Sequence, residues 1–189
     1  MTNPSKALFL ERRVLHDVDI SRRPPRRSEF RFPSGMIKGF REVASLGIPV
    51  VIFSNEDDVA FGRLAPRDVS HYTEGLQRVL LSRGVSVDRI LHCPFHPGGK
   101  GEFRRDSVYH LPNVGMVMAV RQELGISPRE SWLVARSSRA LLAGIRAGCL
   151  TIQVRGEEIP EYFVDPDLAV SDLAGAFRAI VAHELALAR

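Results

Sequence analysis

The sequence predicts an α/β domain in which helices cover both faces of a mostly parallel sheet. Short, strongly apolar runs of strand length alternate with longer stretches whose apolar residues recur at helical spacing, a pattern typical of such folds. The chain has 189 residues, 44% of them hydrophobic, which is enough to bury a substantial core. We therefore expect one doubly wound domain over residues 1–189, with three layers and no large cap domain.

The first half of the chain contains three expected strands with helices between them. A buried strand is expected at residues 7–10, followed by a helix that Ser34 caps and Gly47 ends. Pro66 begins the next helix, which Gly84 closes, because proline favours the first helical position and glycine the position after the last turn. The other strands of this half are expected at residues 49–53 and 89–93.

The second half continues the alternation after a long segment without a regular period. Residues 94–112 are rich in glycine, proline and charge, which predicts a long loop. Such loops in compact domains are usually functional or held by something such as a metal. Beyond the loop, helices are expected at residues 114–124, 139–147 and 172–187, and strands at residues 132–135 and 150–154.

Charge and cysteine content exclude several classes of function. The net charge of +4 is weak for a nucleic-acid binder, and the arginine-rich stretch at residues 22–27 lacks aromatic residues for base stacking. We expect this stretch to be a solvated loop or a loop that faces phosphate. Two cysteines cannot form a disulfide framework, and no segment has the apolar character of a signal peptide or a membrane span. A cytoplasmic protein that binds neither nucleic acid nor membrane is expected.

Polar residues follow three of the expected strands. Residues 11–13 (Glu-Arg-Arg) follow the first strand, residues 54–58 (Ser-Asn-Glu-Asp-Asp) the second, and residues 136–138 (Arg-Ser-Ser) the strand at 132–135. In a doubly wound sheet, ligands bind at the carboxyl ends of the strands. We therefore expect the functional site where these three loops meet.

These segments resemble the haloacid dehalogenase superfamily of phosphatases, and within it the histidinol-phosphate and heptose-bisphosphate phosphatase branch. Residues 6–13 (KALFLERR) are similar to the family's opening strand followed by Asp-Arg-Asp, and residues 50–55 (VVIFSN) to its second strand, which ends in Thr-Asn. Residues 92–104 (HCPFHPGGKGEFR) resemble its Cys-Pro-His-His-Pro and Lys-Gly-Glu loop. The resemblance runs from Lys6 to about Gly148 and implies a phosphatase fold.

The catalytic positions implied by this resemblance carry altered residues. The family's nucleophile and its general acid-base, both aspartates, correspond to Glu11 and Arg13. A glutamate carboxylate lies one methylene further out, and a guanidinium cannot exchange a proton near neutral pH. Arg136 occupies the position of an acidic residue that helps to hold the catalytic Mg²⁺, and Leu111 that of a phosphate-binding lysine. Four catalytic elements of the family are therefore altered in this chain: the nucleophile, the general acid-base, a Mg²⁺-binding acid and the phosphate-binding lysine.

The zinc loop implied by the resemblance is altered in the same way. Its ligand positions are occupied by Cys93, Phe95, Ser107 and Tyr109. Three histidines lie nearby in the sequence, but their spacing fits no familiar tetrahedral site; these are His92, His96 and His110. We expect no bound zinc, solvated histidines, and a loop held by packing of Phe95, Phe103 and Tyr109.

The sequence is interpreted as a phosphatase homologue that has lost catalysis and binds a phosphorylated sugar or similar small anion. Arg13 and Arg136 would face the anion, with Ser54 and Asn55 completing the site, or Glu11 would pair directly with Arg136. No cofactor is expected in this interpretation. Assembly with a protein partner is a further possibility. In another interpretation, none of these residues has a function. Arg13 and Arg136 would then be solvated surface side chains, and Ser54 and Asn55 would be turn formers.

The alternative interpretation is an active phosphatase. It would act on a sugar monophosphate, a sugar bisphosphate or histidinol phosphate, with Glu11 as an atypical nucleophile and Mg²⁺ as cofactor. Another group would then have to serve as acid or metal ligand. The candidates are His16, Asp17, Asp57 and Asp58, although acidic residues in a loop usually face solvent.

Overall fold

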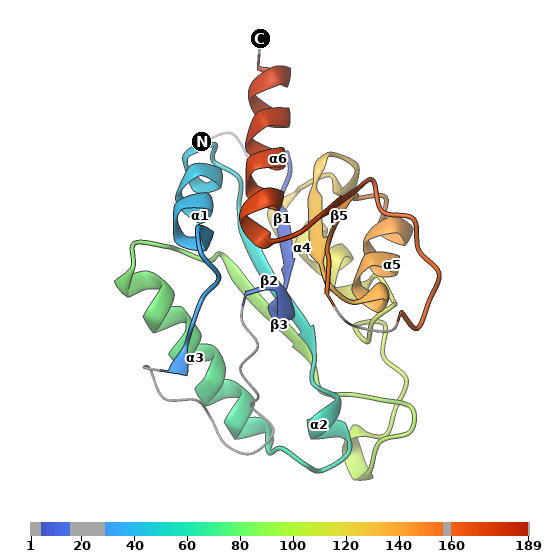
Figure 1. Ribbon diagram of the computed structural model, residues 1–189. Coiled ribbons are helices and arrows are strands. Elements are labelled where there is room, and N and C mark those ends of the chain that lie inside the picture. Colours follow the sequence, from blue (N-terminus) through green and yellow to red (C-terminus); the bar gives the residue numbers. More distant parts are fainter. Residues whose placement is uncertain (1–4, 16–28, 157–159, 189) are drawn as a thin grey trace.

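A computed structural model describes residues 5–15, 29–156 and 160–188 of the chain. Its centre is a six-stranded parallel sheet with the strand order β3-β2-β1-β4-β5-β6 (Figure 1). The predicted α/β class is confirmed. The strands are β1 (Leu8–Glu11), β2 (Val50–Asn55), β3 (Arg89–Cys93), β4 (Trp132–Ala135), β5 (Leu150–Val154) and β6 (Leu168–Val170).

Helices cover both faces of the sheet, with α1, α3 and α6 on one face and α4 and α5 on the other (Figure 1). Within the described ranges, short 3₁₀ turns lie at Arg12–Val14, Gly101–Phe103 and Pro128–Glu130. None of the helices in the described ranges has the length and apolar character of a membrane span. The helices are α1 (Met36–Ser45), α2 (Asp57–Ala60), α3 (Pro66–Ser82), α4 (Gly115–Leu124), α5 (Ser138–Ala147) and α6 (Leu173–Leu187).

Alternating side chains of the central strands build two separate cores. Leu8 and Leu10 of β1 pack beneath α1, α3 and α6, whereas Phe9 packs beneath α4 and α5. Successive residues of a strand point to opposite faces, so a strand covered on both faces must be apolar throughout. This requirement explains the continuous apolar run of β4, whose four residues are all buried. The bounds of β3, β4 and β5 agree with the prediction.

Several local predictions are wrong. The strands expected at residues 7–10 and 49–53 span Leu8–Glu11 and Val50–Asn55, so both end later than predicted. Helix α1 begins after Gly35, whose φ of 75° is left-handed, so the expected cap at Ser34 is displaced by one residue. Strand β6 and helix α2 were not expected. They are three and four residues long, and segments of that length are too short to show a hydrophobic periodicity. The expected helix at residues 139–147 begins one residue earlier, after Ser137, whose Oγ accepts the backbone N–H of Ala140 at 3.3 Å.

The strand register brings three loops to one edge of the sheet, as predicted. Glu11 at the end of β1 is level with Phe53 of β2, and Leu10 is level with Val134 of β4. The chain therefore leaves β1, β2 and β4 on the same side. The strand order also reverses between β1 and β4, and such a switch point is where doubly wound sheets bind ligands.

Helix α6 is tied to the sheet through Glu184. One oxygen of this carboxylate is 2.7 Å from Nζ of Lys6, and the other accepts the indole N–H of Trp132 at 2.9 Å. Burial raises the pKa of Glu184, but these two hydrogen bonds and the nearby charges of Lys6 and His183 outweigh it, so the pKa lies below its ordinary value of 4.5.

We expect Glu184→Gln to lower the free energy of unfolding at pH 7 by about 1 kcal/mol, because a neutral amide makes weaker hydrogen bonds with Lys6. A carboxylate with a depressed pKa stabilises the fold above its unfolded pKa, and this stabilisation is lost as the pH falls through the folded pKa. The difference between the two proteins should therefore shrink below about pH 4.5. Urea titrations at several pH values measure it. Glu42→Gln, in the exposed pair with Lys38, is the control and should change stability little.

Candidate functional site

A pocket of about 510 Å³ opens at the carboxyl ends of β1, β2 and β4. The structure brings together here the five site residues expected from the sequence, which are Glu11, Arg13, Ser54, Asn55 and Arg136. The wall also contains residues that the sequence interpretation did not assign to the site, among them Arg12, Glu56, Ser137, Arg139 and Glu161. Two further predicted residues, His16 and Asp17, and the arginine-rich stretch at 22–27 lie outside the described residues.

Glu11 ends β1 with its side chain turned toward the first turn of α5. Its Oε2 accepts the backbone N–H groups of Arg136 and Ser137 at 2.7 and 2.9 Å, and its Oε1 accepts the hydroxyl of Ser137 at 2.6 Å. The residue is only 4% exposed. A helix N-terminus carries unpaired N–H groups and a partial positive charge, so a buried carboxylate there is well stabilised. Both oxygens of Glu11 are thus hydrogen-bonded to the two residues before α5.

The two arginines at altered family positions, Arg13 and Arg136, both line the pocket. The bond between Glu11 and Arg136 runs through the backbone N–H of Arg136, which replaces the side-chain salt bridge considered from the sequence. The side chain of Arg136 lies beside Gly156, where an added Cβ would be 2.9 Å from Cδ of the arginine.

Ser54 belongs to β2 and bonds to a buried acid that follows the strand. Its Oγ donates to Oε1 of Glu56 at 2.6 Å, and the same oxygen is 3.1 Å from Nη1 of Arg12. The guanidinium of Arg12 also lies over the ring of Tyr72, 5.0 Å from its centroid. Ser54 is therefore neither a turn former nor a free phosphate donor, because its hydroxyl proton is already used.

Asn55 fixes the segment that precedes α4. Its Oδ1 accepts the backbone N–H of Leu111 at 3.0 Å, and its Nδ2 donates to the carbonyl of Leu111 at 3.4 Å. Asn55 is the last residue of β2, so the expectation of a turn former is wrong here too. This reciprocal pair attaches the end of the long loop to the end of β2.

Asp57, expected in a solvent-facing loop, begins α2 and is engaged on both oxygens. Oδ1 is 3.1 Å from Nε2 of His110, and Oδ2 is 3.5 Å from Nη1 of Arg139. Burial raises the pKa of Asp57, but the hydrogen bond with His110 and the charges of His110, Arg139 and His96 outweigh it and leave the pKa below its usual value. His110 is only 8% exposed, so the expectation of a solvated histidine is wrong for this residue.

Among the residues of the pocket wall that the structure describes, each acidic side chain has a hydrogen-bond or ion-pair donor. Arg139 bonds to Glu161 through two pairs of atoms, at 2.5 and 3.0 Å, and also approaches Asp57. Arg63 bonds to Asp58 at 2.6 Å. Since Glu11 and Glu56 are likewise engaged, the negative charge of these described residues is largely compensated.

The zinc positions of the resembled family form a packed corner without a tetrahedral ligand set. Sγ of Cys93 lies 3.7 Å from the carbonyl of Phe95, and burial raises the pKa of this thiol. The ring of Phe95 stacks on Phe103 with centroids 6.0 Å apart and carries the guanidinium of Arg105 at 3.5 Å. Aromatic packing was expected and is present for this pair, but the expectation was wrong for Tyr109, which is 43% exposed.

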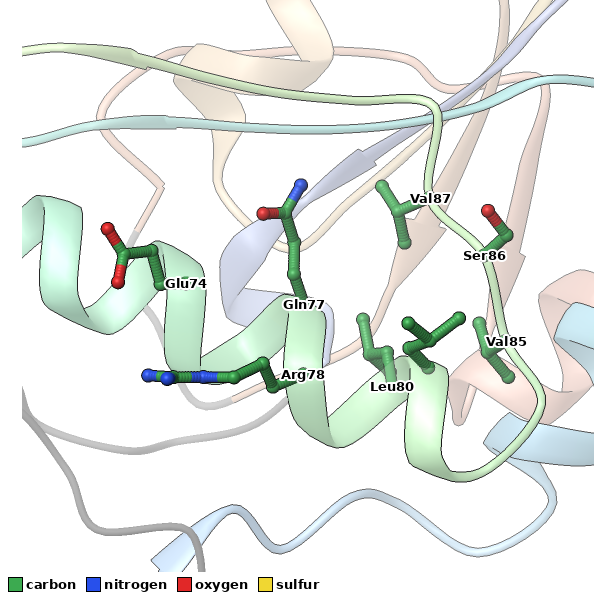
Figure 2. Close-up of a pocket in the computed structure, with 8 residues that line it drawn as sticks. Glu74, Gln77, Arg78, Leu80, Val85, Ser86 and Val87 are labelled. Atoms are coloured by element: carbon green, nitrogen blue, oxygen red, sulfur yellow. The ribbon is translucent and has the colours of Figure 1, made fainter.

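A second cavity, of about 390 Å³, lies between the end of α3 and residues 85–87 (Figure 2). Residue 89 begins β3, so this cavity is near the start of that strand, whereas the site described above lies at the strand ends. Its wall is mainly apolar, with Glu74 and Arg78 toward one end. It contains none of the residues expected at the site.

The chain is similar in sequence to known bacterial phosphatases. No protein-family model matches the chain. The D-glycero-β-D-manno-heptose-1,7-bisphosphate 7-phosphatase of Haemophilus influenzae is 31% identical over 178 residues, which cover 85% of this chain and 92% of that protein. The protein of the same name from Escherichia coli K12 is 29% identical over 192 residues, which cover 95% of this chain and 96% of that protein.

Two solved structures have the same fold. A HAD-like phosphatase from Mesorhizobium loti superposes with a TM-score of 0.78 and 26% identity, over 94% of this chain and 86% of that one. The D,D-heptose 1,7-bisphosphate phosphatase of B. bronchiseptica, solved with magnesium and phosphate, superposes with a TM-score of 0.75 and 21% identity, over 94% and 99%.

Magnesium in such a pocket requires several oxygen ligands in near-octahedral geometry. Here both oxygens of Glu11 already accept hydrogen bonds from Arg136 and Ser137, the two residues before α5. Arginines occupy positions 13 and 136, which both line the pocket. The residues present therefore do not fit a magnesium ion bound at Glu11.

Proposed function

Because the chain belongs to the heptose bisphosphate phosphatase branch of the haloacid dehalogenase superfamily, we propose that its pocket binds a phosphorylated sugar. The observation that carries this proposal is the pocket itself, in which Arg13 and Arg136 line the switch point between β1 and β4. Guanidinium groups suit phosphate because they present several donors in a planar fork.

We further propose that the family's phosphoryl transfer has been lost. A carboxylate nucleophile must direct an oxygen lone pair at phosphorus, whereas both oxygens of Glu11 accept bonds from Arg136 and Ser137. The general acid-base position holds Arg13, which stays protonated. Loss of a general acid typically reduces a rate by about 10² to 10⁴.

Retained phosphatase activity is the second candidate, and the names of the relatives favour it over loss of catalysis. One feature of the site supports it chemically. Asp57 and His110 form a hydrogen-bonded pair at 3.1 Å, and Asp57 lies in the wall of the pocket. A carboxylate-histidine pair can move a proton near neutral pH, so it could replace the missing acid-base group.

Phosphate release and ligand binding, measured side by side, test both candidates. The panel consists of heptose 1,7-bisphosphate, histidinol phosphate, sugar monophosphates and an aryl phosphate, each with Mg²⁺. We expect no release above a protein-free blank, and calorimetric binding of the sugar bisphosphate but not of the free sugar. Release that Glu11→Gln abolishes would contradict the loss of the family reaction, and release that Asp57→Asn abolishes would establish the second candidate.

Arginine variants test the binding mode. We expect Arg13→Ala and Arg136→Ala each to weaken binding of the sugar bisphosphate by at least about tenfold, since a charged hydrogen bond contributes about 1.5–3 kcal/mol. Arg67→Ala, an exposed arginine of α3, is the matched control and should bind normally. Binding unaffected by both pocket variants would rule out this pocket as the site. Absence of any binding would leave assembly with a protein partner as the role.

A further inference from the structure

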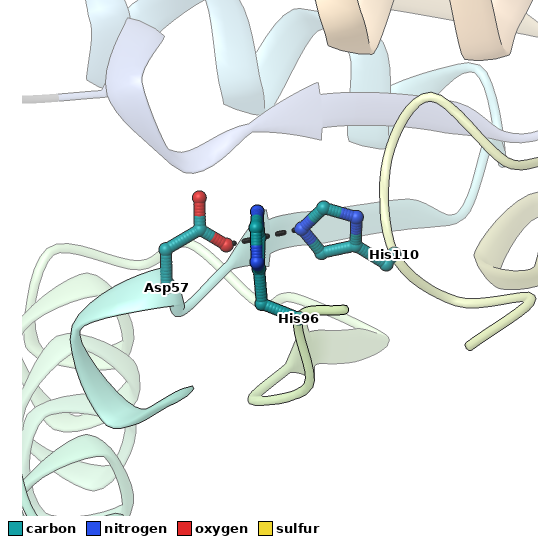
Figure 3. Close-up of side chains that lie close together, drawn as sticks. All are labelled: Asp57, His96 and His110. Atoms are coloured by element: carbon teal, nitrogen blue, oxygen red, sulfur yellow. Dashed lines mark hydrogen bonds and ion pairs between the residues drawn. The ribbon is translucent and has the colours of Figure 1, made fainter. Parts of the chain in front are cut away.

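Three metal-ligating side chains from separate segments converge beside the pocket (Figure 3). The ligand atoms of Asp57, His96 and His110 all lie within 4.8 Å of one another. The Asp57 and His110 atoms are 3.1 Å apart, and the two imidazole rings meet edge to face with centroids 4.9 Å apart. We propose that these residues bind a divalent transition-metal ion, with Zn²⁺ the best match. This inference does not depend on whether the pocket binds or hydrolyses a phosphorylated sugar.

The distances suit a small tetrahedral ion. With metal-ligand bonds of about 2.0–2.2 Å, the ligands of tetrahedral Zn²⁺ are about 3.4 Å apart. The Asp57–His110 pair is already near that spacing, and the widest pair in the cluster must close by little more than about 1 Å. Two imidazoles and one carboxylate favour Zn²⁺ and related ions over Mg²⁺, which prefers oxygen ligands.

The three segments are held together by bonds that do not involve these side chains. The loop carrying His96 is tied to α2 by the backbone N–H of Lys100, which donates to the carbonyl of Ala60 at 2.8 Å. The segment carrying His110 is fixed by the pair between Asn55 and Leu111. The ligands are therefore brought together before any ion binds, which lowers the conformational cost of binding.

The neighbours of Asp57 orient its carboxylate toward the two histidines. Arg139 approaches Oδ2, whereas Oδ1 is the atom that faces His110. An aspartate side chain is ionised at neutral pH, as a carboxylate metal ligand must be. Asp57 also lies in the pocket wall, so three protein ligands would leave a coordination position at the pocket's edge for water or an anion.

His96 must change its hydrogen bonding when a metal binds. Its Nδ1 accepts the backbone N–H of Gly98 at 2.9 Å, so in the neutral ring the proton is on Nε2. A metal on Nε2 moves that proton to Nδ1 and breaks the bond with Gly98. The ring of Phe61, 4.9 Å away between centroids, supports the imidazole while this happens. The backbone amide of Gly98 should therefore report binding.

Titration of the metal-free full-length chain with Zn²⁺ tests the proposal, using calorimetry for stoichiometry and amide NMR for location. We expect one ion per chain and a large shift of the Gly98 amide signal. Asp57→Asn, His96→Ala and His110→Ala should each weaken binding at least about 10- to 100-fold, because loss of even an indirect support to a ligand has that effect.

Two control variants separate this site from its surroundings. His92→Ala removes an exposed histidine of β3, and Cys93→Ser removes the nearby thiol; both should bind Zn²⁺ as the unmodified chain does. Circular dichroism shows whether each variant is folded. The three ligand positions are tested in separate variants, so the test still works if one of the variants does not fold. The proposal is overturned by absent one-to-one binding, by normal affinity in the folded ligand variants, or by equal weakening in the controls.

Discussion

Glu11→Ala should lower the free energy of unfolding by about 2–4 kcal/mol, the largest effect that we expect from a single substitution at the site. The variant leaves two backbone N–H groups and the hydroxyl of Ser137 without their acceptor at the start of α5. Each such group costs about 1–3 kcal/mol when it is buried, although water from the adjacent pocket can replace part of the lost bonding.

Glu11→Gln is the informative partner of that variant, with an expected loss of only about 1 kcal/mol. Its amide oxygen can still accept both N–H groups, and its amide nitrogen can donate to Oγ of Ser137 after the hydroxyl rotates. Glu102→Ala, at an exposed acid, is the surface control. Chemical denaturation with an unchanged m value measures all three. Equal losses in Glu11→Ala and Glu102→Ala would show that Glu11 is not a structural acceptor.

The sequence predicted the class of the fold and most of its longer elements. Strands β3, β4 and β5 have the predicted bounds, although only β4 is buried from end to end, whereas the fully buried β1 begins and ends one residue later than predicted. Helix ends differ by one or two residues, since a cap depends on backbone conformation as well as residue type, as Gly35 shows at α1. Strand β6 is three residues long and partly exposed, so it has no pattern to detect.

The location of the site was also predictable, but its pairing was not. Parallel strands end at one edge, so Glu11, Ser54 and Arg136 had to lie near one another. Which oxygen meets which donor depends on rotamers. Glu11 reaches the backbone N–H groups of Arg136 and Ser137, just before α5, where a side-chain salt bridge was one expectation. His96 and His110 lie within a loop of irregular conformation, and only the folded path of that loop brings them to Asp57.

Two helical glycines should respond to alanine in opposite directions, which tests the packing of both helices on one face of the sheet. A Cβ added to Gly39 of α1 would lie 2.3 Å from Cδ2 of Phe177 in α6, whereas one added to Gly75 of α3 would lie 3.5 Å from the ring of Phe30. The first distance requires a neighbour to move, and the second is an ordinary contact.

Gly39→Ala should lower the free energy of unfolding by about 1–3 kcal/mol, because Phe177 already packs on Phe40 with centroids 5.2 Å apart and has little room to retreat. Gly75→Ala should raise it by about 0.5–1 kcal/mol, since alanine is the better helix former and nothing opposes it. Urea midpoints of the two variants give the comparison. Phe177→Leu in the Gly39→Ala background should recover part of the loss if the clash is its cause. Equal effects at the two glycines would instead mean that helix propensity alone governs both positions, and that α1 and α6 do not pack as closely as described.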